Sequence, residues 1–391
     1  MIKVAMLTPF FTEKLGGPYN VITEIVPFLE KKKVQTKIYT TSAYSQKGKT
    51  RIEFFQQINE SFTIYRFNSF LRFREYRISL KMLPFLLKDS KNINIIHSHA
   101  VRSFQEDIGF LTSLTKKIPF IVSPHGGISI NWDYSDKIPK LISDKSIGFI
   151  KRKILNPHFI AVIKGEIPII KKYGINEDHI HYIPHGVNTE IFKQVDSREL
   201  RQKYNLENCD VLLYVGRIAK GKGVDTLIKI LYNIIQKKRN IKLIIVGGDS
   251  GYLPIVRSLI QKYNLSQFVI FTGHVSKFNL AKYYSLADLV IYPSRQEIFG
   301  LVITEAMACG KPVIGSDILG PSEIILNGKT GYTSNFKDTI KVSELVIDLL
   351  NDRKLLTQMG KKGLERVKEE YTWEKAAESH FNLYKRVLNK N

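Results

Sequence analysis

The chain has 391 residues, and at about 150 residues per domain this length predicts two domains, each large enough to bury a core. Hydrophobic residues are 43% and charged residues 24% of the sequence, which excludes a disordered or fibrous chain. The 59 Lys and Arg outnumber the 36 Asp and Glu, giving a formal net charge of +23. Such a charge predicts an anionic partner: nucleic acid, an acidic membrane face or a phosphorylated substrate.

The two cysteines and the N-terminus predict a cytoplasmic protein. Cys209 and Cys309 cannot make a disulfide scaffold or a cysteine-based zinc site, and they fit a reducing compartment. The short apolar run Met1–Leu7 is typical of a first strand rather than a signal peptide. No uncharged apolar stretch approaches the roughly 20 residues needed to cross a bilayer.

In the first half, short apolar runs alternate with amphipathic segments. The expected strands are Ile2–Leu7, Lys37–Thr41, Phe62–Phe67, Asn94–His97 and Phe120–Ser123. Helical patterns between them include Tyr19–Lys32 and Ser79–Lys88. This alternation predicts an α/β domain with a parallel sheet covered on both faces.

The same pattern restarts near Asp210. Here the expected strands are Val211–Val215, Lys242–Val246, Phe268–Thr272, Leu289–Tyr292 and Pro312–Gly315. The Pro- and Gly-containing segment Tyr182–Asn188 is interpreted as the linker, and Tyr371–Leu388 as a terminal amphipathic helix. We therefore expect domains at 1–187 and 188–372, a helix at 373–391, and a ligand cleft between the halves.

The segment Ser294–Glu305 is the most informative motif. It follows an expected strand and leads into a helix that should end near Gly310, a residue suited to a helix C-cap. The amides of Phe299, Gly300, Leu301 and Val302 would then lie at a helix N-terminus, which attracts phosphate. Glu297 precedes this helix and Glu305 lies about one turn inside it, so both carboxylates could face one ligand. The alternative is an ordinary helix start with Glu305 solvated.

Two Gly-rich segments follow other expected strands of the second half. In Val215–Gly223, Arg217 offers a planar fork for phosphate oxygens and Lys222 adds a compact charge. A solvated basic turn is the alternative, which suits Lys220 better than Arg217, since Arg217 is expected to be held between strand and loop. With Val246–Asp249, these segments predict a nucleotide site, although no Walker motif or full dinucleotide fingerprint is present.

Histidines and a basic aromatic segment leave alternatives open. His97 and His99, like His179 and His181, have the one-residue spacing of a zinc-binding strand face, but no clear carboxylate accompanies them. We expect His97 to be a hydrogen-bonded core residue and His99 a cleft residue. The segment Arg66–Arg77, expected as a helix or ordered loop, could bind an anionic membrane or lipid-linked acceptor, stack on nucleic-acid bases, or be a solvated loop. Membrane binding is favoured and nucleic acid is disfavoured.

Together these motifs resemble the retaining glycosyltransferases of family GT4, which have the GT-B fold of two Rossmann-like domains facing across a cleft, with a C-terminal helix that returns to the N-terminal domain. The matching segments run nearly the whole length of the chain: Gly16–Gly17, His97–His99, Ser123–Gly126, Ile183–Asn188, Gly216–Gly223, Glu297–Glu305, Gly320–Glu323 and Asn327–Gly331. Departures are His185 in place of the usual Asn, Asn188 in place of a frequent Asp, and no serine in Ile163–Glu166. They affect acceptor preference and hinge detail rather than the chemistry.

The resemblance implies a role for each matched residue. Arg217 and Lys222 would bind the donor diphosphate, Glu305 the ribose and Glu297 the transferred sugar. The residues that would contact the donor or the reacting centre through backbone or side chain are Gly16, Gly17, His125, Val275, Phe299, Gly300, Leu301 and Val302. Of these, His125 would lie beside the reacting centre and Val275 would belong to the backbone that recognises the base.

The implied activity is hexosyl transfer from a UDP- or GDP-sugar to a lipid-linked or saccharide hydroxyl, with retention of configuration. No Asp-x-Asp pair occurs in the sequence, so we expect no metal or other cofactor. The expected location is the cytoplasm, with the inner membrane face as a peripheral site. Two alternatives stay open: a GT-B epimerase or phosphorylase, and a non-catalytic nucleotide-sugar binder.

Overall fold

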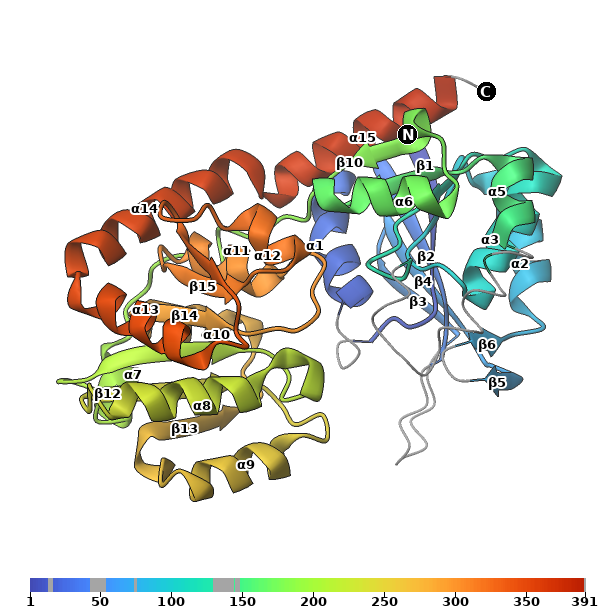
Figure 1. Ribbon diagram of the computed structural model, residues 1–391. Coiled ribbons are helices and arrows are strands. Elements are labelled where there is room, and N and C mark those ends of the chain that lie inside the picture. The colour runs from blue at the N-terminus through green and yellow to red at the C-terminus, as the bar shows by residue number, and fades with distance from the viewer. Residues whose placement is uncertain (13–16, 43–53, 74–75, 129–143, 145–147, 390–391) are drawn as a thin grey trace. The chain divides into compact units, whose positions relative to one another are not determined.

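The computed structural model describes residues 1–12, 17–42, 54–73, 76–128, 144 and 148–389 (Figure 1). Its contacts divide the chain into two compact units. Unit 1 contains Met1–His185 and Trp373–Asn391, and unit 2 contains Gly186–Thr372. The division therefore lies two residues before the boundary expected at 187, and the terminal helix belongs with the N-terminal part of the chain.

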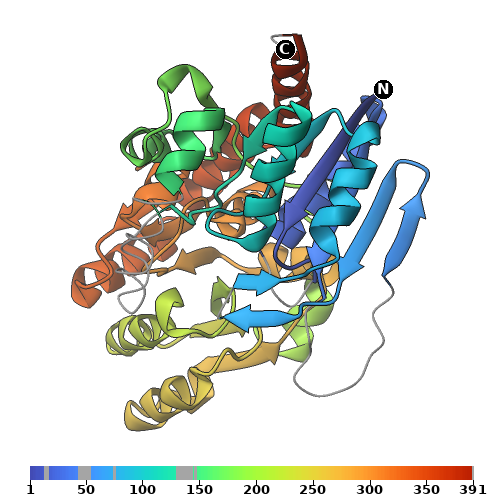
Figure 2. The same cartoon turned by 90° about the vertical axis from the view of Figure 1, so that its right-hand side faces the viewer.

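Unit 1 is built on a sheet with the strand order β10-β9-β8-β7-β1-β2-β4-β3 among its described residues. The strands are β1 (Ile2–Thr8), β2 (Val34–Thr41), β3 (Phe55–Asn59), β4 (Phe62–Phe67), β7 (Ile95–Ser98), β8 (Phe120–Val122), β9 (His158–Ala161) and β10 (Ile180–Tyr182). Neighbours are parallel except β3, which lies antiparallel to β4 at one edge (Figure 2). The wholly parallel sheet expected from the sequence is thus wrong at this edge, where the two-residue turn between β3 and β4 permits only an antiparallel pairing.

The helices of unit 1 are α1 (Gly17–Lys31), α2 (Met82–Asp89), α3 (Phe104–Lys116), α5 (Phe149–Leu155), α6 (Ile167–Tyr173) and α15 (Trp373–Asn389). The apolar stripe of α1 is buried, as its helical spacing predicts. The C-terminal helix α15 packs against α1, and Lys32 just after α1 contacts Glu378 on α15. The predicted return of this helix to the N-terminal domain is confirmed.

The segment Arg66–Arg77 is neither the helix nor the loop that we expected. After β4 it forms a small antiparallel sheet from β5 (Leu71–Phe73) and β6 (Tyr76–Ile78). Arg77 is buried, donates a hydrogen bond of 3.1 Å to the Ser42 carbonyl and lies 4.4 Å from the ring of Phe10. An arginine with these contacts stabilises the fold and is not available to a membrane. Arg74 lies outside the described residues, as does the side chain of Arg72.

Unit 2 has a sheet whose described strands are all parallel, in the order β13-β12-β11-β14-β15-β16. The strands are β11 (Asp210–Val215), β12 (Ile241–Val246), β13 (Val269–Gly273), β14 (Leu289–Tyr292), β15 (Val313–Ser316) and β16 (Gly331–Ser334). The helices are α7 (Arg198–Lys203), α8 (Val224–Ile235), α9 (Leu253–Lys262), α10 (Lys277–Leu286), α11 (Leu301–Ala308), α12 (Leu319–Ile324), α13 (Thr339–Asn351) and α14 (Arg353–Glu370). The central strands are nearly continuous apolar runs because helices cover both faces.

Each sheet has one point at which the strand order reverses. In unit 1 the strands that follow β1 lie on one side of it, and β7 and the strands that follow it lie on the other side. In unit 2 the corresponding neighbours are β11 and β14. Ligands of open α/β sheets bind beyond the carboxyl ends of strands at such a reversal, so the loops after these strands are the first place to look for a site.

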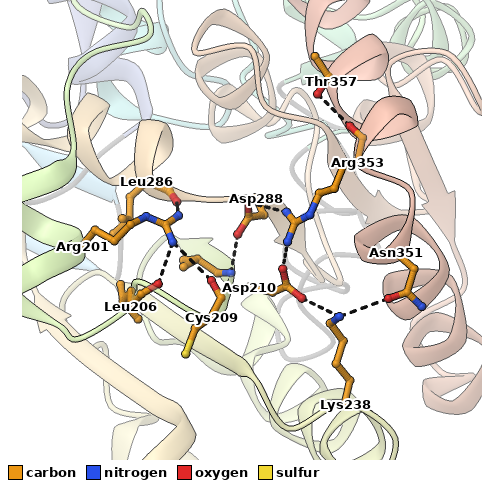
Figure 3. A network of polar contacts seen from close by, with 11 residues as sticks. Arg201, Leu206, Cys209, Asp210, Lys238, Leu286, Asp288, Asn351, Arg353 and Thr357 are labelled. Carbon is orange, nitrogen blue, oxygen red and sulfur yellow. Dashed lines mark hydrogen bonds and ion pairs between the residues drawn. The ribbon is translucent and has the colours of Figure 1, made fainter.

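The opposite, amino ends of β11 and β14 are held together by a charged network (Figure 3). Asp210 forms an ion pair with Lys238, with 2.9 Å between Oδ2 and Nζ, and it also contacts Arg353. Arg353 reaches Asp288 at 2.7 Å, and the other Asp288 oxygen accepts a 2.8 Å hydrogen bond from the amide of Val211. The amino ends of the two strands are therefore linked by side chains as well as by the pairing of the sheet.

Within the part of the chain that the structure describes, every helix is too short or too polar to span a lipid bilayer.

Candidate functional site

The loop between β14 and α11 forms the centre of the candidate site in unit 2. Gly300 has a φ of 90°, a conformation that suits glycine, and α11 begins at the next residue. Ile298 and Phe299 are buried, which anchors the loop. The helix starts as the sequence predicted, so the amides of Leu301 and Val302 lie in a first turn, where intrahelical acceptors are lacking. The helix ends before Gly310, whose φ is 67°.

Glu297, in the same loop, lies between a cation and a phenol. Its Oε2 is 2.8 Å from Nζ of Lys222 and also accepts a hydrogen bond from the Tyr292 hydroxyl. Lys222 is 3.4 Å from that hydroxyl, so the three groups form one cluster. Burial and the neighbouring carboxylate hold the pKa of Tyr292 well above its usual value, so the phenol remains a donor to Glu297. About a fifth of each charged side chain is exposed, 23% for Lys222 and 21% for Glu297, so a ligand can reach both.

Glu305 is held by a second tyrosine. The hydroxyl of Tyr284, a fully buried side chain of α10, lies 2.8 Å from Oε2 of Glu305. Burial, followed by the charge of Glu305, raises the pKa of Tyr284 well above the ordinary range. Glu305 is therefore oriented by the core of unit 2, which argues against the solvated helix-start alternative.

The loop after β11 brings Lys222 to Glu297 because Gly223 allows a close approach. A Cβ on Gly223 would lie 2.0 Å from the carbonyl oxygen of Pro293, and its φ is 71°. Arg295 secures the same loop, since its amide donates to the Gly221 carbonyl at 2.9 Å and its guanidinium donates to the Lys220 carbonyl at 2.7 Å. Backbone contacts therefore hold the loop after β11 against the loop after β14.

Arg217 lies on the first part of this loop. Its side chain is exposed and makes no hydrogen bond or ion pair with any residue that the structure describes, so the expectation that strand and loop hold it in place is wrong. Only its carbonyl is engaged, as the acceptor of a 2.9 Å hydrogen bond from Tyr214. The side chain is free to turn toward an anion beyond the end of β11.

The loops after β12 and β13 complete the edge of the site. A Cβ on Gly247 would lie 1.9 Å from the Gly216 carbonyl oxygen, so these two strand ends are in direct contact. Asp249 accepts hydrogen bonds from the amides of residues 251–253, and these bonds, above all the one from Leu253, hold its pKa below the usual range. Val275 lies half-buried in the segment between β13 and α10.

Two of the predicted donor-site residues belong to unit 1. Gly17 is the first residue of α1, and Gly16 lies outside the described residues. His125 follows β8 and is also part of unit 1. It adopts a φ of 46°, unusual for a residue with a side chain, and is partly exposed.

His125 belongs to a cluster of histidines from distant parts of unit 1. Neighbouring rings are in contact, with centroids 4.2 Å apart for His97 and His99, which are tilted by 32°, and 5.3 Å for His99 and His125 and 5.5 Å for His125 and His185, which are near parallel. His380 of α15 lies 5.9 Å from His97. Burial lowers the pKa of every member, to about 4 for His125 and His380, so the cluster is uncharged at neutral pH.

His97 is the hydrogen-bonded core histidine that the sequence predicted. Its Nδ1 is 2.9 Å from the Tyr384 hydroxyl and its Nε2 is 2.9 Å from Ser123 Oγ. His99 is only 2% exposed, so the prediction of a cleft residue is wrong: the ring is packed between those of His97 and His125. Among the described residues, no three His, Cys, Asp or Glu side chains are arranged to bind a metal together.

Two family models match adjoining parts of the chain. Glycosyltransferase Family 4 matches residues 15–191, and Glycosyl transferases group 1 matches residues 196–366. Between them they cover most of unit 1, without its C-terminal helix, and most of unit 2. The chain belongs to glycosyltransferase family 4.

Two relatives that are at least 30% identical match in sequence over about half of the chain. N-acetyl-alpha-D-glucosaminyl L-malate synthase of Bacillus anthracis is 30% identical over 55% of the chain. The GDP-mannose-dependent alpha-(1-6)-phosphatidylinositol monomannoside mannosyltransferase of Mycobacterium tuberculosis is 32% identical over 51%. The chain covers 58% and 54% of the lengths of these two relatives.

A solved structure has a similar fold over nearly the whole length of this chain. The Anabaena protein HepE, in complex with UDP and glucose, superposes with a TM-score of 0.79 over 99% of this chain and 100% of its own, at 16% identity. The predicted GT-B fold is confirmed.

Sequence reasoning missed three residues that organise the candidate site. Tyr292 and Tyr284 orient the two glutamates, and Arg295 holds the β11 loop. Tyr292 is the last residue of an apolar strand and lies two residues before Ser294, where the motif begins, and that position was the one available signal. Tyr284 approaches from another helix, so spacing along the chain could not reveal it.

Proposed function

We propose that this glycosyltransferase moves a hexosyl unit from a nucleoside-diphosphate sugar to a hydroxyl of a lipid-linked or saccharide acceptor, with retention of anomeric configuration. The observation that carries the proposal is the ion pair of Lys222 and Glu297 beside the N-terminus of α11, at the reversal of strand order in unit 2. A cation and helix amides suit a diphosphate, and a carboxylate suits sugar hydroxyls.

The proposed roles follow from what each group can donate or accept. As the bond between sugar and diphosphate breaks, negative charge grows on the terminal phosphate. Lys222, Arg217 and the first amides of α11 stabilise that charge without rearrangement of solvent. Glu297 accepts from hydroxyls of the transferred sugar, and Glu305 accepts from the ribose. The resemblance to family 4 adds His125 beside the reacting centre.

We propose substitution on the front face of the sugar, with no metal. Glu297, which is paired with Lys222 and accepts a hydrogen bond from Tyr292, is assigned to binding the transferred sugar rather than to covalent attack. The acceptor hydroxyl then attacks from the side that the diphosphate leaves, and an oxygen of the departing phosphate takes its proton. The chain has no Asp-x-Asp pair to hold a divalent cation, so the positive charge comes from the protein.

Product analysis tests this proposal. We expect an α-linked product from an α-configured donor by NMR, and full activity of the purified enzyme in EDTA. An inverted anomer would refute retention, and activity that returns only with Mn²⁺ or Mg²⁺ would refute metal independence. Sugar release without transfer to any hydroxyl acceptor would favour the epimerase or phosphorylase alternative.

The donor nucleotide is proposed as UDP or GDP. The name of the mycobacterial relative specifies GDP-mannose, and the HepE structure holds UDP. A thermal-shift panel of UDP, GDP and ADP distinguishes them, since a ligand at 100 times its dissociation constant stabilises the native state by about 2.7 kcal/mol. Stabilisation by ADP alone would contradict the proposal.

A surface of unit 1 fits the inner face of an anionic membrane. On α5, the side chains of Phe149, Ile150 and Ile154 are 51%, 54% and 57% exposed. Neighbouring α3 adds two further exposed leucines, Leu111 and Leu114. Basic residues lie near these apolar ones: Lys153 on α5, and Lys116 and Lys117 at the end of α3. Apolar side chains with adjacent cations are the pattern of interfacial membrane binding.

Vesicle sedimentation tests this surface. The double variant Ile150→Glu with Ile154→Glu should lose binding to vesicles that contain anionic lipid. Ile340→Glu, at a position 65% exposed on α13 of unit 2, is the matched control and should bind as wild type does. Equal binding by all three proteins, or none by wild type, would refute a role for α5.

A further inference from the structure

In the hydrogen bond between His99 and His125, either ring could be the donor, depending on which nitrogen of each ring carries the proton. Nδ1 of His99 lies 3.1 Å from Nε2 of His125. Both rings are neutral in the buried cluster, so each carries one proton, and one nitrogen of the pair must donate while the other accepts. Two arrangements are possible, and they give His125 opposite hydrogen-bonding character.

The surroundings of His99 favour one arrangement. Its Nε2 is buried and has no hydrogen-bond partner among the described residues. If the proton were on Nε2, an N–H donor would be buried without an acceptor, which native structures rarely tolerate. With the proton on Nδ1 that donor is satisfied by Nε2 of His125, and only a lone pair of His99 is left without a partner.

The neighbouring rings favour the observed orientation of His99. The ring lies between those of His97 and His125, and His97 is itself held at both nitrogens by Tyr384 and Ser123. A flip of His99 would exchange Nδ1 for Cδ2 and place a carbon atom against Nε2 of His125. The observed orientation of His99 is therefore the one that keeps its hydrogen bond with His125.

We propose that His99 is a positioning residue that keeps His125 protonated on Nδ1, so that His125 offers a hydrogen-bond donor to an oxygen of the bound substrate. This inference rests on the proposed function for the identity of that substrate. His125 is partly exposed, and its Nδ1 makes no hydrogen bond with another described residue. In this tautomer the residue donates to a sugar hydroxyl or phosphate oxygen and cannot act as a general base through Nδ1.

Long-range ¹H–¹⁵N spectra of the full-length protein, labelled on histidine, test the tautomer directly. The His125 signals are assigned by their loss in His125→Asn. We expect the pattern of an Nδ1-protonated ring in wild type at pH 7.5. An Nε2-protonated His125 would overturn the proposal, whether or not a sugar donor has been identified.

Two substitutions of His99 separate positioning from packing. His99→Asn retains an N–H donor near the place of Nδ1, whereas His99→Leu fills similar space without one. We expect turnover within about twofold of wild type for the asparagine variant and about tenfold lower kcat for the leucine variant, with donor KM little changed. Equal losses in both variants would show that His99 only packs, and would overturn the proposal.

A second histidine pair of unit 1 provides the matched control. His158 and His181, on β9 and β10, make a 3.0 Å contact outside the cluster. His181→Leu should alter neither the His125 tautomer nor kcat. If no donor is turned over by wild type, the proposed function fails while the spectra still decide the role of His99.

Discussion

Gly223→Ala is the most informative single change to the candidate donor site. The added Cβ would lie 2.0 Å from the Pro293 carbonyl oxygen, while Cβ atoms are essentially never found closer than 3.0 Å to such an atom. The loop that carries Lys222 must therefore move by about 1 Å away from the end of β14. This movement separates Lys222 from Glu297, which lies in the loop after β14. Gly221 is two residues earlier in the same loop, and a Cβ there would meet nothing within 4 Å.

The expected magnitude has two parts. A left-handed conformation, here a φ of 71°, costs an alanine about 1–2 kcal/mol. Forcing an extra carbon into a close backbone contact costs about 1–3 kcal/mol more. The sum of about 2–5 kcal/mol corresponds to a decrease in Tm of roughly 5–15 °C for a unit of this size.

Thermal unfolding and nucleotide binding measure the two consequences. Gly223→Ala should unfold at a lower temperature and bind UDP or GDP at least tenfold more weakly, because Lys222 is displaced from the diphosphate. Gly221→Ala should match wild type in both measurements. If Gly223→Ala binds nucleotide as tightly as Gly221→Ala and is equally stable, the argument that the backbone holds Lys222 in place is refuted.

Three further predictions concern the charges. Glu297→Gln, which removes the ion pair but not the side-chain shape, should reduce turnover about 10–100-fold in an assay of nucleoside-diphosphate release; an unchanged rate would contradict a role in sugar binding. Burial lowers the pKa of His125 and His380 to about 4 from an ordinary value of 6.5, so the unfolded chain takes up protons first as the pH falls. The free energy of unfolding by urea should therefore decrease between pH 6.5 and pH 4, by up to about 1.4 kcal/mol per pH unit for each histidine, and a flat profile would contradict this. Asp210→Ala should destabilise the protein by about 1–3 kcal/mol without weakening nucleotide binding, since it breaks the network at the far ends of the strands. Asp196→Ala, which breaks an ion pair on the surface, should show no comparable effect in the same melting experiment.

Much of the fold could be predicted because buried parallel strands are apolar runs. β4 and β14 have the predicted bounds, and the other predicted strands differ by a few residues at their ends. The strands that were missed are short, and β3 is mostly exposed and includes two glutamines. Such segments become strands through pairing with a neighbour, which hydropathy along the chain does not record.

The site was predictable to the level of motifs but not of contacts. The position of Gly300 at a helix start was evident from the strand and helix patterns on either side of it. The ion pair of Lys222 with Glu297 joins residues 75 positions apart and depends on how two loops approach each other. The histidine cluster joins the first part of the chain to His380 in the last helix, and only the three-dimensional packing of α15 brings them together.

Binding of nucleoside diphosphates to matched site variants tests the central claim most directly. Isothermal titration of UDP and GDP against wild type should detect micromolar or tighter binding of at least one of them. Lys222→Met should lose at least tenfold in affinity, and Lys220→Met, on the same turn but outside the ion pair, should bind as wild type does. If neither nucleotide binds wild type, or if Lys222→Met binds as tightly as Lys220→Met, unit 2 does not contain the donor site described for this family 4 glycosyltransferase.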